Sequence, residues 1–185
     1  MDYQPAHFAI LPSPEVYERH PLHSPGSPRV EQISDTGYWI SALSNAGWVI
    51  TEEGVVLIDS GSNRREVIQA LRRTTDEPIR YVIYTHGHGD HTFTLDRYEE
   101  FAEAETQVVA HSLVPERLSK YEMLAPHIAR TNQVQFRGSR PGRPLPPAGT
   151  QPASPPGRKY PDIVYDGEFQ FSLGGRRFEL FHARA

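Results

Sequence analysis

The chain has 185 residues, 17 of them proline and none of them cysteine. Its length predicts one domain, and the lack of cysteine excludes disulfide scaffolds, thiolate-held metal sites and thiol nucleophiles. A net charge of −4 lacks the basic excess that is typical of proteins that bind nucleic acids or membrane surfaces, so we expect neither partner. No apolar run is long enough to span a bilayer and the N-terminus does not resemble a signal peptide, which predicts a cytoplasmic protein.

The placement of the prolines divides the chain. Six of them precede Val30, and because proline fixes φ and lacks an N–H, residues 1–29 are predicted to form an extended, proline-rich arm. Residues 30–185 are then the folded domain. Within it, Gly138–Pro161 holds eight prolines and is predicted to be a long loop. Such a loop is either a surface insertion or a flap over a substrate, and the sequence leaves both open.

Strands and helices are predicted in alternation after an initial β-hairpin. Segments rich in β-branched and aromatic residues predict strands at Tyr38–Leu43, Trp48–Thr51, Val55–Asp59, Ile79–Tyr84, Thr106–Ala110, Glu168–Leu173 and Arg177–Phe181. Apolar residues at helical spacing predict helices at Arg64–Arg73, Leu95–Glu105 and about Val114–Ala129. This order indicates a mixed sheet that carries helices, and therefore the α/β class.

One segment concentrates side chains that bind metals. Directly after the strand Ile79–Tyr84 the chain reads His86-Gly87-His88-Gly89-Asp90-His91. Imidazole and carboxylate groups are the natural ligands of zinc-like ions when thiolates are absent, and α/β proteins place sites at the carboxyl ends of strands. The two glycines are predicted to let the backbone turn tightly enough for the side chains to converge. The simpler alternative is a solvated loop that happens to be rich in histidine.

This segment matches the His-x-His-x-Asp-His signature of the metallo-β-lactamase superfamily of metal-dependent hydrolases. Val55–Gly61 similarly resembles the strand and Asp-x-Gly turn that precede the signature in that family, and the likeness is strongest over residues 33–111. The resemblance implies an αββα sandwich, of which this chain would hold the N-terminal half and the start of the second half. It also implies a site for two zinc ions, or for iron or manganese in some branches.

The resemblance assigns roles to five residues of this chain. His86 and His88 would bind the first metal and Asp90 and His91 the second, with Asp90 also taking part in catalysis. Asp59 would accept hydrogen bonds that orient the ligand loop. The alternative for Asp59 is a capping role at the turn into the next helix.

Two further histidines are candidate pocket residues. His111 ends the strand Thr106–Ala110 at the sheet edge that carries the histidine loop, where the alternative is a hydrogen-bonded structural role. The segment 109–112 also resembles the equivalent strand of the alkylsulfatase-like branch. His182 follows the last predicted strand, near where the family supplies a later ligand, and the alternative for it is a frayed strand end.

The expected function is therefore a metal-dependent hydrolase whose activated hydroxide attacks an ester, amide, thioester or sulfate-type bond of a small-molecule substrate. Because the family's later ligands have no counterpart in this sequence, we expect an N-terminal portion that is weakly active alone. Its exposed strand edges favour a homo-oligomer. The alternative is a non-catalytic remnant or interaction module that retains the metal-binding loop.

Overall fold

The computed structural model describes residues 29–41, 44–103, 105–135 and 157–183. The predicted arm, apart from its last residue Arg29, lies outside the described residues, and so do residues 138–156 of the predicted loop. Within the described ranges, no helix combines the length and the apolar character needed to cross a membrane.

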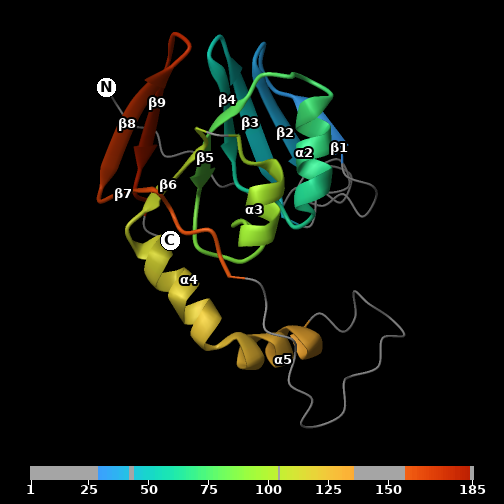
Figure 1. Cartoon of the computed structure of the whole chain (residues 1–185), viewed down its shortest axis with the longest axis vertical. Helices are drawn as coiled ribbons and strands as arrows, with labels where there is room; N and C mark the ends of the chain where they lie inside the picture. Colours follow the sequence, from blue (N-terminus) through green and yellow to red (C-terminus); the bar gives the residue numbers. More distant parts are fainter. Residues whose placement is uncertain (1–28, 42–43, 104, 136–156, 184–185) are drawn as a thin grey trace, which may run out of the picture.

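A mixed seven-stranded sheet forms the centre of the molecule, with its strands in the order of the sequence (Figure 1). The antiparallel strands are β1 (Arg29–Gln32), β2 (Gly37–Ser41), β3 (Ala46–Thr51) and β4 (Gly54–Ile58). The strands that continue parallel to β4 are β5 (Ile79–Tyr84), β6 (Gln107–His111) and β7 (Ile163–Tyr165). The predicted α/β class is confirmed, whereas β1 and β7 were not predicted.

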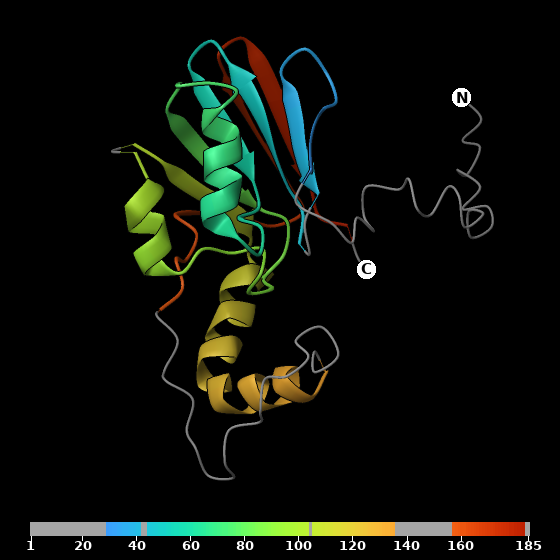
Figure 2. The same ribbon diagram turned by 90° about the vertical axis from the view of Figure 1, so that its right-hand side faces the viewer.

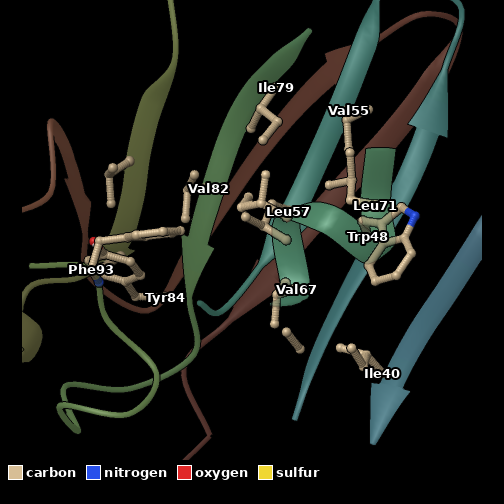
Figure 3. Packing of buried hydrophobic residues seen from close by; sticks show 14 of the residues in the cluster. Ile40, Trp48, Val55, Leu57, Val67, Leu71, Ile79, Val82, Tyr84 and Phe93 are labelled. Atoms are coloured by element: carbon tan, nitrogen blue, oxygen red, sulfur yellow. Dashed lines mark hydrogen bonds between the residues drawn. The ribbon is translucent and has the colours of Figure 1, made fainter. Parts of the chain in front are cut away.

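Two helices, α2 (Arg64–Arg72) and α3 (Leu95–Phe101), cover one face of this sheet (Figure 2). The sheet residues Leu57 and Val82 pack with Val67 and Leu71 of α2 in the main core, and each of these side chains is at most 2% exposed (Figure 3). Burial of each such side chain contributes roughly 1.5–3 kcal/mol. The core thereby fixes the strand ends from which the histidine loop emerges.

The opposite face carries a separate hairpin, β8 (Glu168–Leu173) and β9 (Arg176–Phe181), as predicted (Figure 2). Its Phe171 ring lies 4.3 Å from the Tyr81 ring of the large sheet. At the hairpin turn, Gly174 has φ 51°, and a Cβ atom there would lie 2.5 Å from the backbone nitrogen of Glu52. The layers are therefore helix, sheet and sheet, which is the start of the predicted αββα sandwich.

The helix predicted at Leu95–Glu105 is shorter in the structure. It ends at Phe101 because Ala102 is extended, with φ −70° and ψ 135°. The Glu103 N–H then donates to Thr106 Oγ1 at 2.9 Å, which turns the chain into β6. Glu103 and Glu105, which the predicted helix included, therefore lie in the connection between α3 and β6.

The helix predicted at about Val114–Ala129 is two helices, α4 (Leu113–Met123) and α5 (Ala125–Gln135). They meet at Leu124, where φ is −100° and ψ is 14°. Proline has no N–H, so in an unbroken helix Pro126 would leave the Glu122 carbonyl without its intrahelical bond. Both helices project beyond the carboxyl ends of the parallel strands, and α4 begins beside the loop that follows β5, whereas α5 lies at the far end of α4 (Figures 1 and 2).

Candidate metal centre

The histidine loop and Asp59 meet at the carboxyl ends of two neighbouring parallel strands. Asp59 directly follows β4, and its N–H donates to the Ile83 carbonyl of β5 at 2.9 Å. The Ser60 N–H donates to the His91 carbonyl at 3.1 Å. Backbone hydrogen bonds therefore hold the turn after β4 against the loop after β5.

The buried Asp59 carboxylate accepts three hydrogen bonds from the histidine loop and the residue before it. Asp59 is 5% exposed and has φ 60°, a left-handed conformation that is uncommon outside glycine and that concentrates at functional sites. Its Oδ1 accepts the Thr85 N–H at 2.8 Å, and its Oδ2 accepts both the Thr85 hydroxyl at 2.7 Å and His91 Nδ1 at 2.8 Å. Asp59 therefore does not cap α2, whose N-cap is Asn63.

These bonds determine how two imidazoles are presented. In the neutral ring, His91 donates from Nδ1 to Asp59 and carries its lone pair on Nε2, which lies 3.2 Å from Ser44 Oγ. Thr85 gives its only hydroxyl proton to Asp59, so it accepts from His86 Nδ1 at 3.0 Å. His86 therefore also presents Nε2 as a lone pair. A carboxylate that fixes the tautomer of a histidine in this way is the usual support of a metal ligand.

The four residues predicted to bind metal are neighbours on the loop, but among the described residues neither His88 nor Asp90 joins a group of three ligand atoms close enough to share one ion. The His86 ring centroid is 4.2 Å from that of His91 and 4.6 Å from that of His88, and Asp90 Oδ2 lies 3.7 Å from His91 Nε2. One ligand atom each from Asp59, His86 and His91 also fall within 4.8 Å of one another. Because both Asp59 oxygens already accept hydrogen bonds, we assign Asp59 an orienting role.

The protonation of the two supported imidazoles is shifted in opposite directions. Burial, followed by the nearby His91 and His88 rings, lowers the pKa of His86 below its ordinary value of 6.5. The hydrogen bond to Asp59 raises the pKa of His91 above 6.5. The lowered pKa favours the neutral form of His86, which is the form that binds a metal ion. A larger fraction of His91 carries a second ring proton, which a metal ion must displace.

Three residues that sequence reasoning missed anchor the loop backbone. Arg64 Nη2 donates to the Gly89 carbonyl at 2.6 Å and to the Thr92 carbonyl at 2.9 Å. Arg158 Nη1 donates to the same Gly89 carbonyl at 2.9 Å, and Ser44 Oγ donates to the Asp90 carbonyl at 2.7 Å. All three are distant from the loop in sequence, and no local pattern around them signals this role.

The predicted tight turn is present, since the His91 N–H donates to the His88 carbonyl at 3.0 Å, and close packing gives both glycines of the loop a second role. Neither glycine has a positive φ. A Cβ atom on Gly87 would lie 2.7 Å from Arg117 Cβ, and one on Gly89 would lie 2.5 Å from Arg158 Nη2. The glycines therefore allow two arginine side chains to lie directly against the loop.

The structure pairs His111 with His182. Their ring centroids are 3.8 Å apart, and His111 Nε2 lies 2.5 Å from His182 Nδ1. His111 Nδ1 accepts the Leu113 N–H at 3.2 Å, which ties its ring to the start of α4. Since Tyr84 and Ala110 are in register, His111 follows at the sheet edge that also carries Thr85. Within the described residues, no hydrogen bond joins either ring to the histidine loop.

Comparison with known proteins places this geometry in a family. A family model described as the metallo-beta-lactamase superfamily matches residues 42–185. A protein of Streptococcus pyogenes serotype M6, described as a probable metallo-hydrolase, is 36% identical over 55 residues, which are 30% of this chain and 23% of that protein.

Solved structures share the fold. The sec-alkylsulfatase Pisa1 from Pseudomonas sp. is similar with a TM-score of 0.64 and 18% identity, over 83% of this chain and 27% of that chain. A metallo-beta-lactamase from Cronobacter sakazakii, a HARLDQ motif mutant, is similar with a TM-score of 0.52 and 18% identity, over 80% of this chain and 51% of that chain. The chain thus spans about a quarter of the length of the Streptococcus protein and of the alkylsulfatase. Because the family model covers most of its residues, this chain belongs to the metallo-β-lactamase superfamily.

Proposed function

We propose that this chain contributes the metal-binding part of a hydrolase active site, with His86, His88, Asp90 and His91 as the metal ligands. The observation that carries the proposal is the hydrogen-bond network of Asp59, which places the lone pairs of the neutral His86 and His91 rings on Nε2, with the two ring centroids 4.2 Å apart. A solvated histidine-rich loop has no need for a buried carboxylate that fixes two tautomers.

The donor set fits zinc. Zinc accepts imidazole and carboxylate ligands and takes about four of them, while iron and manganese accept the same donors. When bound, such ions activate water and neutralise the charge that develops on the substrate. We propose two zinc ions, one served by His86 and His88 and the other by Asp90 and His91. Since four side chains of the described residues would serve both ions, we expect slow turnover by the chain alone.

The side chains of the loop have separate proposed tasks. Asp59 and Thr85 keep His86 and His91 in the tautomers that bind metal. Asp90, with its side chain 52% exposed, is free to face a substrate and is proposed to accept the proton that the attacking water loses. The proposed reaction is the hydrolysis of an ester, amide, thioester or sulfate-type bond in a small molecule.

Hydrolysis by the zinc-loaded chain tests this proposal against a matched pair of variants. His88→Ala removes a proposed ligand, whereas His127→Ala removes an exposed histidine of α5. We expect the wild type and His127→Ala to hydrolyse at least one member of a panel of p-nitrophenyl esters, thioesters and alkyl sulfates, and His88→Ala to lose that activity. Zinc uptake without hydrolysis of any panel member would instead favour a non-catalytic module.

A further inference from the structure

A short segment after the proline-rich stretch of the chain lies against the end of the histidine loop. We call this segment, residues 157–160, the strap. Its Gly157 carbonyl accepts the Leu95 N–H at 2.8 Å, and its Lys159 N–H donates to the Phe93 carbonyl at 3.0 Å. The residue between them forms an antiparallel bridge with the same part of the loop. The strap is therefore paired through its backbone with the residues that follow the metal-binding motif.

The strap is also held by α4 and by the end of β5. Glu122 of α4 accepts the Arg158 N–H at 3.0 Å through Oε1 and the Tyr160 hydroxyl at 3.1 Å through Oε2. The Tyr84 hydroxyl, at the end of β5, donates to the Lys159 carbonyl at 3.2 Å. Since none of these bonds uses the Arg158 side chain, the fold fixes the backbone of Arg158 and leaves its guanidinium group available to the loop.

The guanidinium group of Arg158 lies against the middle of the histidine loop. Its Nη1 atom donates to the Gly89 carbonyl at 2.9 Å, and Arg64 Nη2 donates to the same oxygen at 2.6 Å. A Cβ atom on Gly89 would lie 2.5 Å from Arg158 Nη2, which places the group directly against the backbone. Hydrogen bonds from charged donors are roughly twice as strong as neutral ones, so this carbonyl is held firmly.

These contacts fix the backbone on both sides of Asp90. The Gly89 carbonyl belongs to the planar peptide unit that ends at the Asp90 Cα atom. On the other side, Ser44 Oγ donates to the Asp90 carbonyl at 2.7 Å. With both adjoining peptide planes held, the direction of the Asp90 Cα–Cβ bond is set. The Asp90 side chain is 52% exposed, and its only ion-pair contact within the described part of the chain is with His91, so the arginines leave the carboxylate available.

We propose that Arg158 is a positioning residue for Asp90, acting together with Arg64 through the Gly89 carbonyl. The inference rests on the proposed function, in which Asp90 binds the second metal ion and accepts a proton. It deepens that function by naming the side chains that aim this carboxylate from behind the loop.

The effect of Arg158 on metal binding should be selective. His91, the other proposed ligand of the second ion, is oriented separately by its 2.8 Å hydrogen bond to Asp59. Loss of the Arg158 side chain therefore disturbs one ligand of that ion, Asp90, and leaves the other in place. The first ion, proposed to bind the two histidines at the start of the loop, should keep its affinity.

Three variants of the whole 185-residue chain test this selectivity. Arg158→Met removes the charge and the donors, so the affinity for one of two zinc ions should fall about 10–100-fold while the other stays unchanged. Arg158→Lys keeps the charge and one donor, so its loss in the same step should be smaller, and it serves as the test if Arg158→Met does not fold. Arg177→Met, which removes a 66% exposed arginine of β9, is the control and should bind zinc as the wild type does.

A double-mutant cycle shows whether Arg158 acts through Asp90. Asp90→Asn removes the proposed ligand, so Arg158→Met should cause no further loss of zinc affinity in that background. Competition with a chromophoric chelator measures the zinc affinities, and urea unfolding measures the stability of each variant separately.

The proposal fails alone if Arg158→Met binds both ions as the wild type does, weakens both equally, or adds its full loss to that of Asp90→Asn. If the wild type takes up no zinc, or if Asp90→Asn binds zinc as the wild type does, the proposed function fails and this inference fails with it.

Discussion

A 2.8 Å hydrogen bond between Asp59 Oδ2 and His91 Nδ1 joins the turn after β4 to the histidine loop after β5. Asp59 occupies a left-handed backbone conformation at φ 60°, and its carboxylate also binds Thr85 through both the N–H and the hydroxyl. The unusual backbone at Asp59 thus places one buried carboxylate where it can orient two neighbouring imidazoles.

Asp59→Asn should weaken metal binding. Asparagine tolerates a left-handed conformation about as well as aspartate does, so the substitution isolates the loss of the carboxylate. The asparagine amide places an N–H group where a carboxylate oxygen accepted a hydrogen bond from Thr85 or His91. This loss should release His91 and lower zinc affinity about 10–100-fold. Chelator competition measures this change. The exposed Asp76 supplies the control Asp76→Asn, and equal zinc affinity in the two variants would contradict the orienting role.

His86 and His91 should titrate in a fixed order in the metal-free protein. Burial lowers the pKa of His86 below 6.5, while the Asp59 hydrogen bond raises the pKa of His91 above 6.5, so His86 should lose its proton first as the pH rises. Because the native state binds the His91 proton more tightly than the unfolded chain does, the resulting stabilisation is complete below the unfolded pKa. It is lost as the pH rises through the folded pKa.

NMR titration of the imidazole ring protons checks this order. In Asp59→Asn the pKa of His91 should fall, since its largest cause is removed. A wild-type His91 that titrates below His86 would show that Asp59 does not hold it.

Gly87→Ala should destabilise the metal-free chain more than Gly89→Ala does. The added Cβ at residue 87 meets Arg117 Cβ and Cγ at 2.7 and 2.8 Å, and these stem atoms cannot move without moving α4. Overpacking of this kind costs about 1–3 kcal/mol. At residue 89 the nearest atom is the tip of the flexible Arg158 side chain. Urea unfolding measures both, and equal midpoints would argue against tight packing of α4 on the loop.

Leu57→Ala should weaken the core beneath the site. Leu57 is 0% exposed and packs in the same cluster as Val67 and Leu71 of α2, so truncation should lower the free energy of unfolding by about 2–5 kcal/mol. Leu113, which is 56% exposed, supplies the control Leu113→Ala, with an expected change within about 0.5 kcal/mol. Thermal unfolding measures both variants. Similar unfolding temperatures for Leu57→Ala and Leu113→Ala would contradict the placement of Leu57 in the core.

The sequence predicted the elements whose signals are local. The strands β4 and β5 could each be predicted from a few adjacent apolar residues. The histidine loop could be predicted in the same way, because its motif comes directly after β5 in the chain. β1 was missed because it begins at the end of a proline-rich stretch, and β7 because its three residues carry too short a pattern. The break at Leu124 was missed because apolar periodicity continues across it, although Pro126 could have signalled it.

The supports of the site could not be predicted in the same way. The role of Asp59 came from a resemblance, and its left-handed backbone has no signal in the sequence. Three other residues act through contacts made only when the chain has folded, namely Thr85, Arg117 and Arg158. Their residue types are common on surfaces and in loops, so the sequence does not single them out. Long-range hydrogen bonds of this kind depend on tertiary packing, which short patterns do not encode.

Metal content per folded chain is the most direct test of the central claim that Asp59 and Thr85 present His86 and His91 to a metal ion. Elemental analysis after dialysis against zinc and gel filtration should give about two ions per wild-type chain and per His127→Ala chain. The double variant His86→Ala/His91→Ala should retain close to none. A wild type without zinc, or a double variant with as much zinc as the wild type, would contradict the account.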